Sequence, residues 1–185
     1  MRVQFLVVLL VLPGVTACSK RDASQEQAAR SDSAVVATNE NVSPVVVREA
    51  GVRFDPPSTW PSERYRVASR AGRAAAEDQP GAAHSVAIHY RPDQPGHEEA
   101  LLCRIVVFAR DDWSRIDAGP HPPVGTLIEN ADEWAFIAQL PQSNPYPRDS
   151  LDGAQFEAMR LSIREMRARF SVEGEGPSKP DAGDL

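Results

Sequence analysis

The chain has 185 residues, a formal net charge of −6 and only 6% aromatic residues. An acidic chain without a clustered basic segment lacks the electrostatic footprint of a nucleic-acid-binding protein, and its overall charge opposes docking on anionic lipid. Once an export signal is set aside, the remaining length suits a single domain.

The N-terminal stretch has the composition of an export signal. Arg2 precedes an apolar run from Val3 to Leu12, and Pro13-Gly14 follow it. The run is shorter than the roughly 20 apolar residues of a membrane-spanning helix. We therefore predict a signal peptide over residues 1–17, for which an ordinary secretory signal with a soluble product is the plainer alternative.

The sequence Val15-Thr16-Ala17-Cys18 resembles the lipobox of bacterial lipoproteins. The resemblance implies cleavage before Cys18 and attachment of palmitate-type acyl chains to this residue. Several chains anchor a protein firmly where one would be marginal. Ser19, where an aspartate would favour the inner membrane, implies the periplasmic face of the outer membrane in a cell with two membranes. In a cell with one, the resemblance implies the outer leaflet of the plasma membrane.

The lipidated end and the C-terminus differ in composition from the middle of the chain. Residues 18–44 are small and polar, and residues 173–185 are acidic and rich in glycine and proline. Segments of this kind bury too little apolar surface to offset the entropy of ordering. We predict a disordered tether over 18–44, a single domain over 45–172 and a disordered acidic tail over 173–185.

Alternating and β-branched stretches predict the strands of this domain. Leu101–Ala109 is apolar on both faces, so we place it at the centre of a sheet covered on both sides. Asp111–Ile116 begins with residues typical of helix N-caps and predicts a short helix. The other predicted strands are 45–47, 51–54, 65–69, 84–90, 125–129 and 133–140.

A single apolar stripe marks the end of the domain. Phe156, Met159, Ile163, Met166 and Phe170 recur at steps of three and four residues. This spacing predicts a long helix, opened by Asp149 or Asp152, with one buried face. The fold class is therefore α+β: an antiparallel sheet of five to seven strands with a long C-terminal helix packed on one face.

Three segments resemble small exported domains of the Mog1/PsbP-like fold class. They are Phe54-x-x-Pro57-x-x-Trp60, the strand 102–109 running into Asp111-Asp112-Trp113, and Leu140-Pro141-Gln142-Ser143-Asn144-Pro145-Tyr146. Members of that class are mostly binding or assembly factors. The resemblance therefore implies the same role here and gives no catalytic residues to transfer.

Motifs for catalysis or cofactor binding are missing from the sequence. It has no Gly-x-Ser-x-Gly elbow, phosphate loop or dinucleotide fingerprint, and we expect no cofactor. Cys103 lies in a predicted strand, where an inert buried thiol is favoured over a nucleophile or redox site. The alternative function is an exported enzyme or metal-binding domain that uses the loops carrying His97, Glu99 and His121.

Large amphipathic side chains near the ends of elements are the candidate binding residues. We select Trp60, Trp113, Asn144 and Tyr146 as possible partner contacts, with a structural role in the core as the competing interpretation. The sequence thus predicts a non-enzymatic, lipid-anchored binding or assembly module. Its expected partner is another envelope protein or the cell wall.

Overall fold

The computed structural model describes residues 43–120, 123–174 and 176–177. They form an α+β domain with two antiparallel sheets and four α-helices, as the sequence predicted for the fold class. The larger sheet has five strands in the order β3-β4-β5-β7-β6. Its strands are β3 (Tyr65–Ala71), β4 (His84–Tyr90), β5 (Ala100–Ala109), β6 (Thr126–Ala131) and β7 (Trp134–Gln139).

A second, three-stranded sheet gathers both ends of the domain. It has the order β1-β2-β8, from β1 (Val45–Val47), β2 (Val52–Phe54) and β8 (Phe170–Val172). The predicted fold has all strands in one sheet and a final helix that continues through Phe170. The structure corrects this, because Phe170 pairs with Phe54 across the small sheet.

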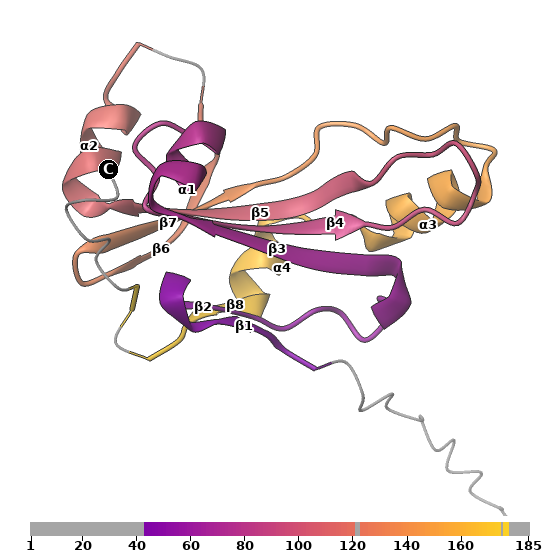
Figure 1. The fold of residues 1–185 in the computed structure, drawn as a ribbon, viewed down its shortest axis with the longest axis horizontal. Coiled ribbons are helices and arrows are strands. Elements are labelled where there is room, and N and C mark those ends of the chain that lie inside the picture. Colours follow the sequence, from indigo (N-terminus) through magenta and orange to yellow (C-terminus); the bar gives the residue numbers. More distant parts are fainter. Residues whose placement is uncertain (1–42, 121–122, 175, 178–185) are drawn as a thin grey trace, which may run out of the picture. The chain divides into compact units, whose positions relative to one another are not determined.

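The helices lie on different sides of the larger sheet (Figure 1). Helix α1 (Gly72–Asp78) and α2 (Arg110–Asp117) cover one face, and the small sheet and α4 (Ile163–Arg169) lie on the other. Helix α3 (Leu151–Met159) lies at the end of the sheet where the loop between β4 and β5 turns. The predicted long helix is therefore two helices, α3 and α4.

The break between these helices has a local cause. Ser162 accepts a hydrogen bond from the backbone of Glu165, and the Glu165 carboxylate accepts one from the backbone of Ser162 at 2.8 Å. This reciprocal capping box starts a new helix. Arg160 already has extended backbone, so the chain changes direction while Met159 and Met166 both stay buried.

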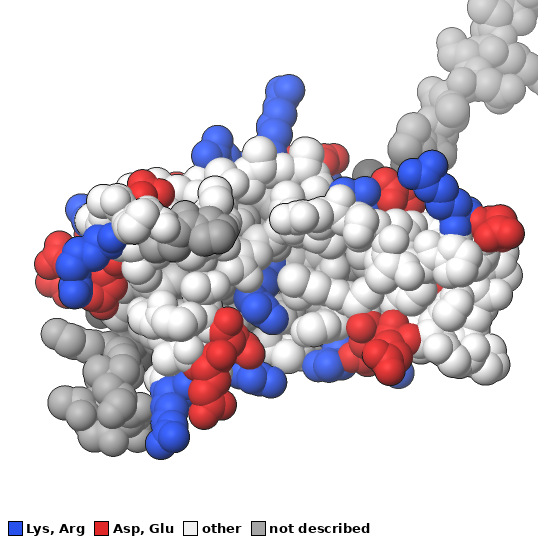
Figure 2. Space-filling view, turned by 90° about the horizontal axis from the view of Figure 1, so that it is seen from above, with Lys and Arg blue, Asp and Glu red and all other residues white. Residues whose placement is uncertain are grey.

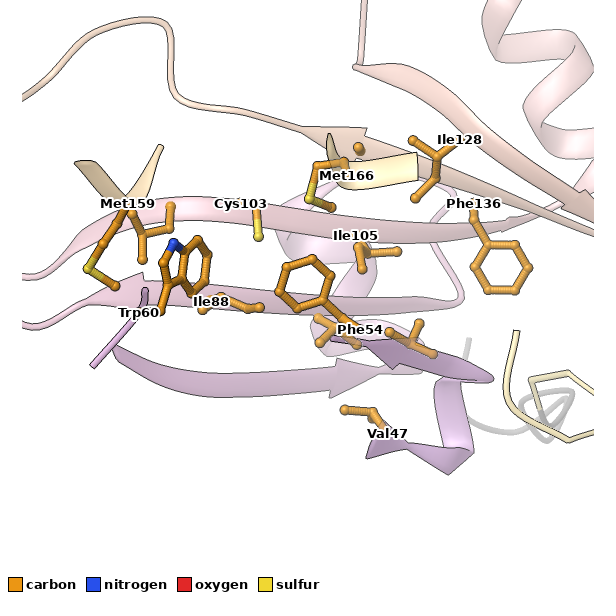
Figure 3. Close-up of a cluster of buried hydrophobic side chains, with 14 of the residues drawn as sticks. Val47, Phe54, Trp60, Ile88, Cys103, Ile105, Ile128, Phe136, Met159 and Met166 are labelled. Atoms are coloured by element: carbon orange, nitrogen blue, oxygen red, sulfur yellow. The ribbon is translucent and has the colours of Figure 1, made fainter. Parts of the chain in front are cut away.

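Two apolar layers enclose the larger sheet. The larger core lies between the two sheets, and it includes Phe54, Trp60, Phe136 and Met166 (Figure 3). The smaller core, around Phe108, lies under α1 and α2. Strand β5 contributes to both cores, which confirms that it is the central strand covered on both faces.

Cys103 belongs to the larger core, where its sulfur points in among the apolar side chains of Figure 3. The thiol is fully buried, and burial raises its pKa to about 12. A thiol with so high a pKa holds its proton at neutral pH and is a poor nucleophile. This supports the interpretation of Cys103 as a core residue.

The ordered chain extends past the predicted end of the domain. The backbone N–H of Glu173 donates to the carbonyl of Gly51 at 3.0 Å, and Pro177 is buried. Gly51 has φ +59, and a Cβ there would lie 2.7 Å from the nitrogen of Pro177. Residues 173, 174, 176 and 177 therefore form a strap against the domain, within a segment that we had predicted to be disordered.

Candidate functional site

The turn before α3 is fixed by its own side chains. Ser150 Oγ accepts from the backbone N–H of Gly153 at 2.9 Å and donates to the carbonyl of Pro147 at 2.7 Å. Asn144 donates from Nδ2 to the Gly153 carbonyl at 2.7 Å and accepts at Oδ1 from the Tyr146 N–H at 3.0 Å. Asn144 is thus a structural bridge that ties the proline-rich turn to the helix.

A groove of about 820 Å³ runs between this turn and α3. Its floor is made of the small residues Gly153, Ala154 and Ala158. Around them lie the side chains of Gln142, Ser143, Asn144, Arg148, Glu157 and Arg160. The volume falls within the range of ligand-binding clefts, and the lining offers amide, hydroxyl and guanidinium groups.

The two arginines of the groove differ in their availability. Arg160 donates to the Glu157 carboxylate at 3.0 Å and to the Pro141 carbonyl at 3.3 Å. Arg148 is exposed, and no residue in the described part of the chain pairs with its side chain. The groove therefore carries one cation that is free to meet an anionic group.

On the other side of α3, Asp152 is a buried carboxylate with four hydrogen-bond donors. It accepts from the Tyr90 hydroxyl at 2.8 Å and from the backbone N–H groups of Asp93 and Gln94 at 2.9 and 3.0 Å. His97 Nδ1 lies 2.8 Å from Oδ2 of Asp152. The predicted cap, Asp149 or Asp152, is wrong: Ser150 caps α3, and Asp152 holds the loop between β4 and β5.

The charge on Asp152 is stabilised by these donors. Burial by itself would raise the pKa of Asp152, but the hydrogen bonds from Asp93, Gln94, His97 and Tyr90 outweigh it and lower the pKa to about 2. Burial and the nearby Asp152 charge in turn raise the pKa of Tyr90 and bring that of Tyr146 to about 12. The cluster therefore holds one carboxylate and two neutral tyrosines at neutral pH.

Tyr146 is packed beneath the turn rather than displayed on it. Its ring lies 5.5 Å from Tyr90, 5.6 Å from Phe156 and 5.1 Å from His97, measured between centroids. Its hydroxyl donates to the carbonyl of Glu98 at 2.6 Å. The Tyr146 side chain is 7% exposed and therefore belongs to the core at this end of the sheet.

The two tryptophans selected as partner contacts are also core residues. Trp60 is 2% exposed and packs against Phe54 and Tyr65, which agrees with the competing interpretation of a structural role in the core. Trp113 is 8% exposed and lies 5.7 Å from Phe108. Of the four selected residues, only Asn144 lines the groove, together with its neighbours Gln142 and Ser143.

The loops of the alternative function are only partly described. His97 is held by Asp152, whereas Glu99 pairs with Arg66 at 2.6 Å, so these two side chains face different partners. His121 and the lipidation candidate Cys18 lie outside the described residues. The pairing of His97 with Asp152 was not predicted from the sequence, because the two residues are far apart along the chain.

Comparisons of the chain with known proteins gave no match. No family model, no curated protein and no solved structure matches it. Within the described ranges, none of the helices is long and apolar enough to cross a membrane.

Proposed function

We propose that this protein is a lipid-anchored lipoprotein of the cell envelope whose domain is a non-enzymatic binding or assembly module. The observation that carries the anchor is the sequence Val15-Thr16-Ala17-Cys18, placed directly after a short apolar run and a single arginine. A short apolar segment followed by a small residue before the cleavage site is the arrangement of an export signal. The cysteine in the next position supplies the thiol for lipid.

The anchor is tested by labelling bacteria that express the full chain with a palmitate analogue. We expect the label and membrane fractionation in the wild type and neither in Cys18→Ser. Cys103→Ser is the matched control, because it removes the only other cysteine and leaves the motif intact. Membrane retention of the Cys18→Ser protein would mean that the segment is not a lipoprotein signal.

The groove between α3 and the Gln142–Tyr146 turn is the surface that we assign to binding. Its small floor admits a ligand close to the helix backbone, and the turn that forms its wall is held rigidly by Asn144 and Ser150. Rigid walls lower the ordering cost of binding. The unpaired Arg148 supplies a positive charge, so we expect an extended polypeptide segment of a partner protein with an acidic side chain in the groove.

Site-specific crosslinking tests the groove. A photoreactive residue at Ser143, which is exposed in the groove wall, should give one reproducible adduct in native membranes. The control position is Ala74, which is exposed on α1 and away from the groove lining. Adducts of equal yield from both positions, or none from Ser143, would exclude the groove as the binding surface.

One observation favours the alternative of an exported enzyme or metal-binding domain. Asp152 accepts from His97 Nδ1, which leaves Nε2 as the nitrogen that could bind a metal or a substrate proton. Metal analysis of the purified full chain decides between the two functions. A stoichiometric transition metal that is lost on His97→Ala would replace the binding-module proposal by this alternative.

A further inference from the structure

The face of the larger sheet that carries α1 and α2 also presents a group of arginines. Across the strands, Ala68 of β3 pairs with Ala87 of β4, and Ala87 pairs with Arg104 of β5. Arg66 and Arg70 flank Ala68 along β3. Because alternate residues of a strand share a face, all three arginines project from the same face around two alanines.

The spacing of these arginines follows from sheet geometry. Arg66 and Arg70 are separated by about 13 Å along β3, and Arg104 lies about 10 Å away across two strand spacings, opposite their midpoint. Alanine in the middle leaves room for the long side chains to approach one another. Figure 2 looks down on this face and shows blue Lys and Arg side chains near its middle, with red Asp and Glu side chains beside them.

Arg104 is the member of the group without a charged partner. Its Nη1 reaches Gln139 Oε1 only at 3.5 Å, and its Nε is buried without a hydrogen-bond partner. In the described part of the chain, no carboxylate pairs with it. A buried donor without an acceptor is destabilising, so a ligand that supplies an acceptor to Arg104 Nε is favoured at this position.

The other two arginines have partners that a ligand could displace. Arg66 pairs with Glu99 at 2.6 Å and Arg70 with Asp78 at 2.9 Å, and both arginine side chains are about half exposed. Exposed ion pairs contribute little free energy. His89 lies beside them on β4, where burial and then the charge of Arg66 lower its pKa; Glu99 opposes this shift, and Arg104 and Arg70 add smaller lowering effects. The patch is therefore positive although the chain is acidic.

We propose that Arg66, Arg70 and Arg104 form a binding site for a phosphate group. Guanidinium groups bind phosphate through paired N–H donors, and phosphate offers several oxygens to donors that converge from different strands. A carboxylate offers two oxygens and suits one arginine better than three. The site lies on the sheet face and shares no residue with the groove beside α3. The phosphate-site proposal is therefore tested independently of the proposed function.

The experiment uses the full chain with Cys18→Ser, which cannot be lipidated. Inorganic phosphate is titrated at constant ionic strength while the side-chain Nε–H resonances of the arginines are followed by NMR. We expect the Arg104 signal to shift, and Arg104→Gln to weaken binding at least tenfold. Arg66→Gln, on the exposed edge strand, should also weaken binding, and it tests the site if Arg104→Gln fails to fold.

Arg164→Gln is the matched control, because it removes the same charge from an exposed position on α4, on the opposite side of the larger sheet. It should leave phosphate binding unchanged. Sedimentation with phosphatidylglycerol vesicles, against phosphatidylcholine vesicles, distinguishes a lipid headgroup from free phosphate as the source of the ligand. Binding to neither probe, or equal losses in Arg104→Gln and Arg164→Gln, would overturn the proposal.

Discussion

At the scale of single residues, Asp152 decides how one end of the domain is held together. The buried carboxylate joins α3 to the loop between β4 and β5 through Tyr90, Asp93, Gln94 and His97. A buried charge is tolerated when donors surround it in this way. The sequence gives no signal for such a cluster, because its members are brought together only by the fold.

Asp152→Asn should destabilise the domain by about 2–4 kcal/mol, since an amide presents an N–H group to donors that need an acceptor. Urea unfolding at pH 7 measures the change. The control is Asp149→Asn, a position that is exposed and has no partner in the described residues. Equal unfolding free energies for the two variants would contradict the role of the Asp152 cluster.

The same carboxylate predicts part of the acid sensitivity. Its pKa is lowered from 3.8 to about 2 on folding, so the unfolded chain binds the proton more tightly. The stabilisation is complete above pH 3.8 and is lost as the pH falls towards 2. We expect the unfolding free energy of the wild type to fall by about 2 kcal/mol more than that of Asp152→Asn between pH 5 and 2. Urea titrations at stepped pH measure this difference, and parallel curves would contradict it.

At the scale of elements, the alternation of apolar residues was a good guide to strands and a poorer guide to the last helix. The stripe from Phe156 to Phe170 fits one long helix, and the structure divides it into α3, α4 and β8. A signal for the division was present in the sequence, since Ser162-Ile163-Arg164-Glu165 has the S-x-x-E spacing of a capping box. Propensity could not reveal that Phe170 extends into a strand, because that depends on its pairing with Phe54.

The start of α3 leaves no room for a side chain at Gly153. A Cβ there would lie 2.0 Å from the Pro147 carbonyl oxygen, so Gly153→Ala must displace the turn that forms the groove wall. We expect a loss of about 1–3 kcal/mol in thermal unfolding, despite the better helix propensity of alanine. Ala158→Gly, an exposed position on the same helix, should cost about 1 kcal/mol from propensity alone. A stabilised Gly153→Ala would mean that the turn is not held as described.

At the scale of the molecule, the division into two sheets was the part of the fold that the sequence could not reveal. The strand segments were largely recognisable. The composition of β1 and β2, however, suits strands that extend the larger sheet as well as strands of a second sheet. Pairing depends on contacts between distant segments, which local patterns do not encode. For the same reason, the tryptophans that looked suited to a binding surface are buried between or beneath the layers.

The strap after β8 should contribute to stability. Pro177 is buried against Gly51, and Gly176 lies beside the Trp134 indole. Ending the chain at Val172 should lower the unfolding free energy by about 1 kcal/mol, from the lost apolar contact, and shift tryptophan emission to longer wavelength. A chain that ends at Pro177 should match the wild type. An unchanged melting temperature for the shorter chain would show that the strap adds no stability.

The small sheet also sets the order in which the domain can fold. β2 lies between β1 and β8, so the middle strand has a complete set of partners only after Phe170–Val172 have been synthesised. Until then, one edge of β2 lacks its partner strand, and Met166 is missing from the core that Val52 and Phe54 share. Contacts between segments so distant along the chain close slowly. The small sheet of this protein is therefore completed only when nearly the whole domain has been synthesised.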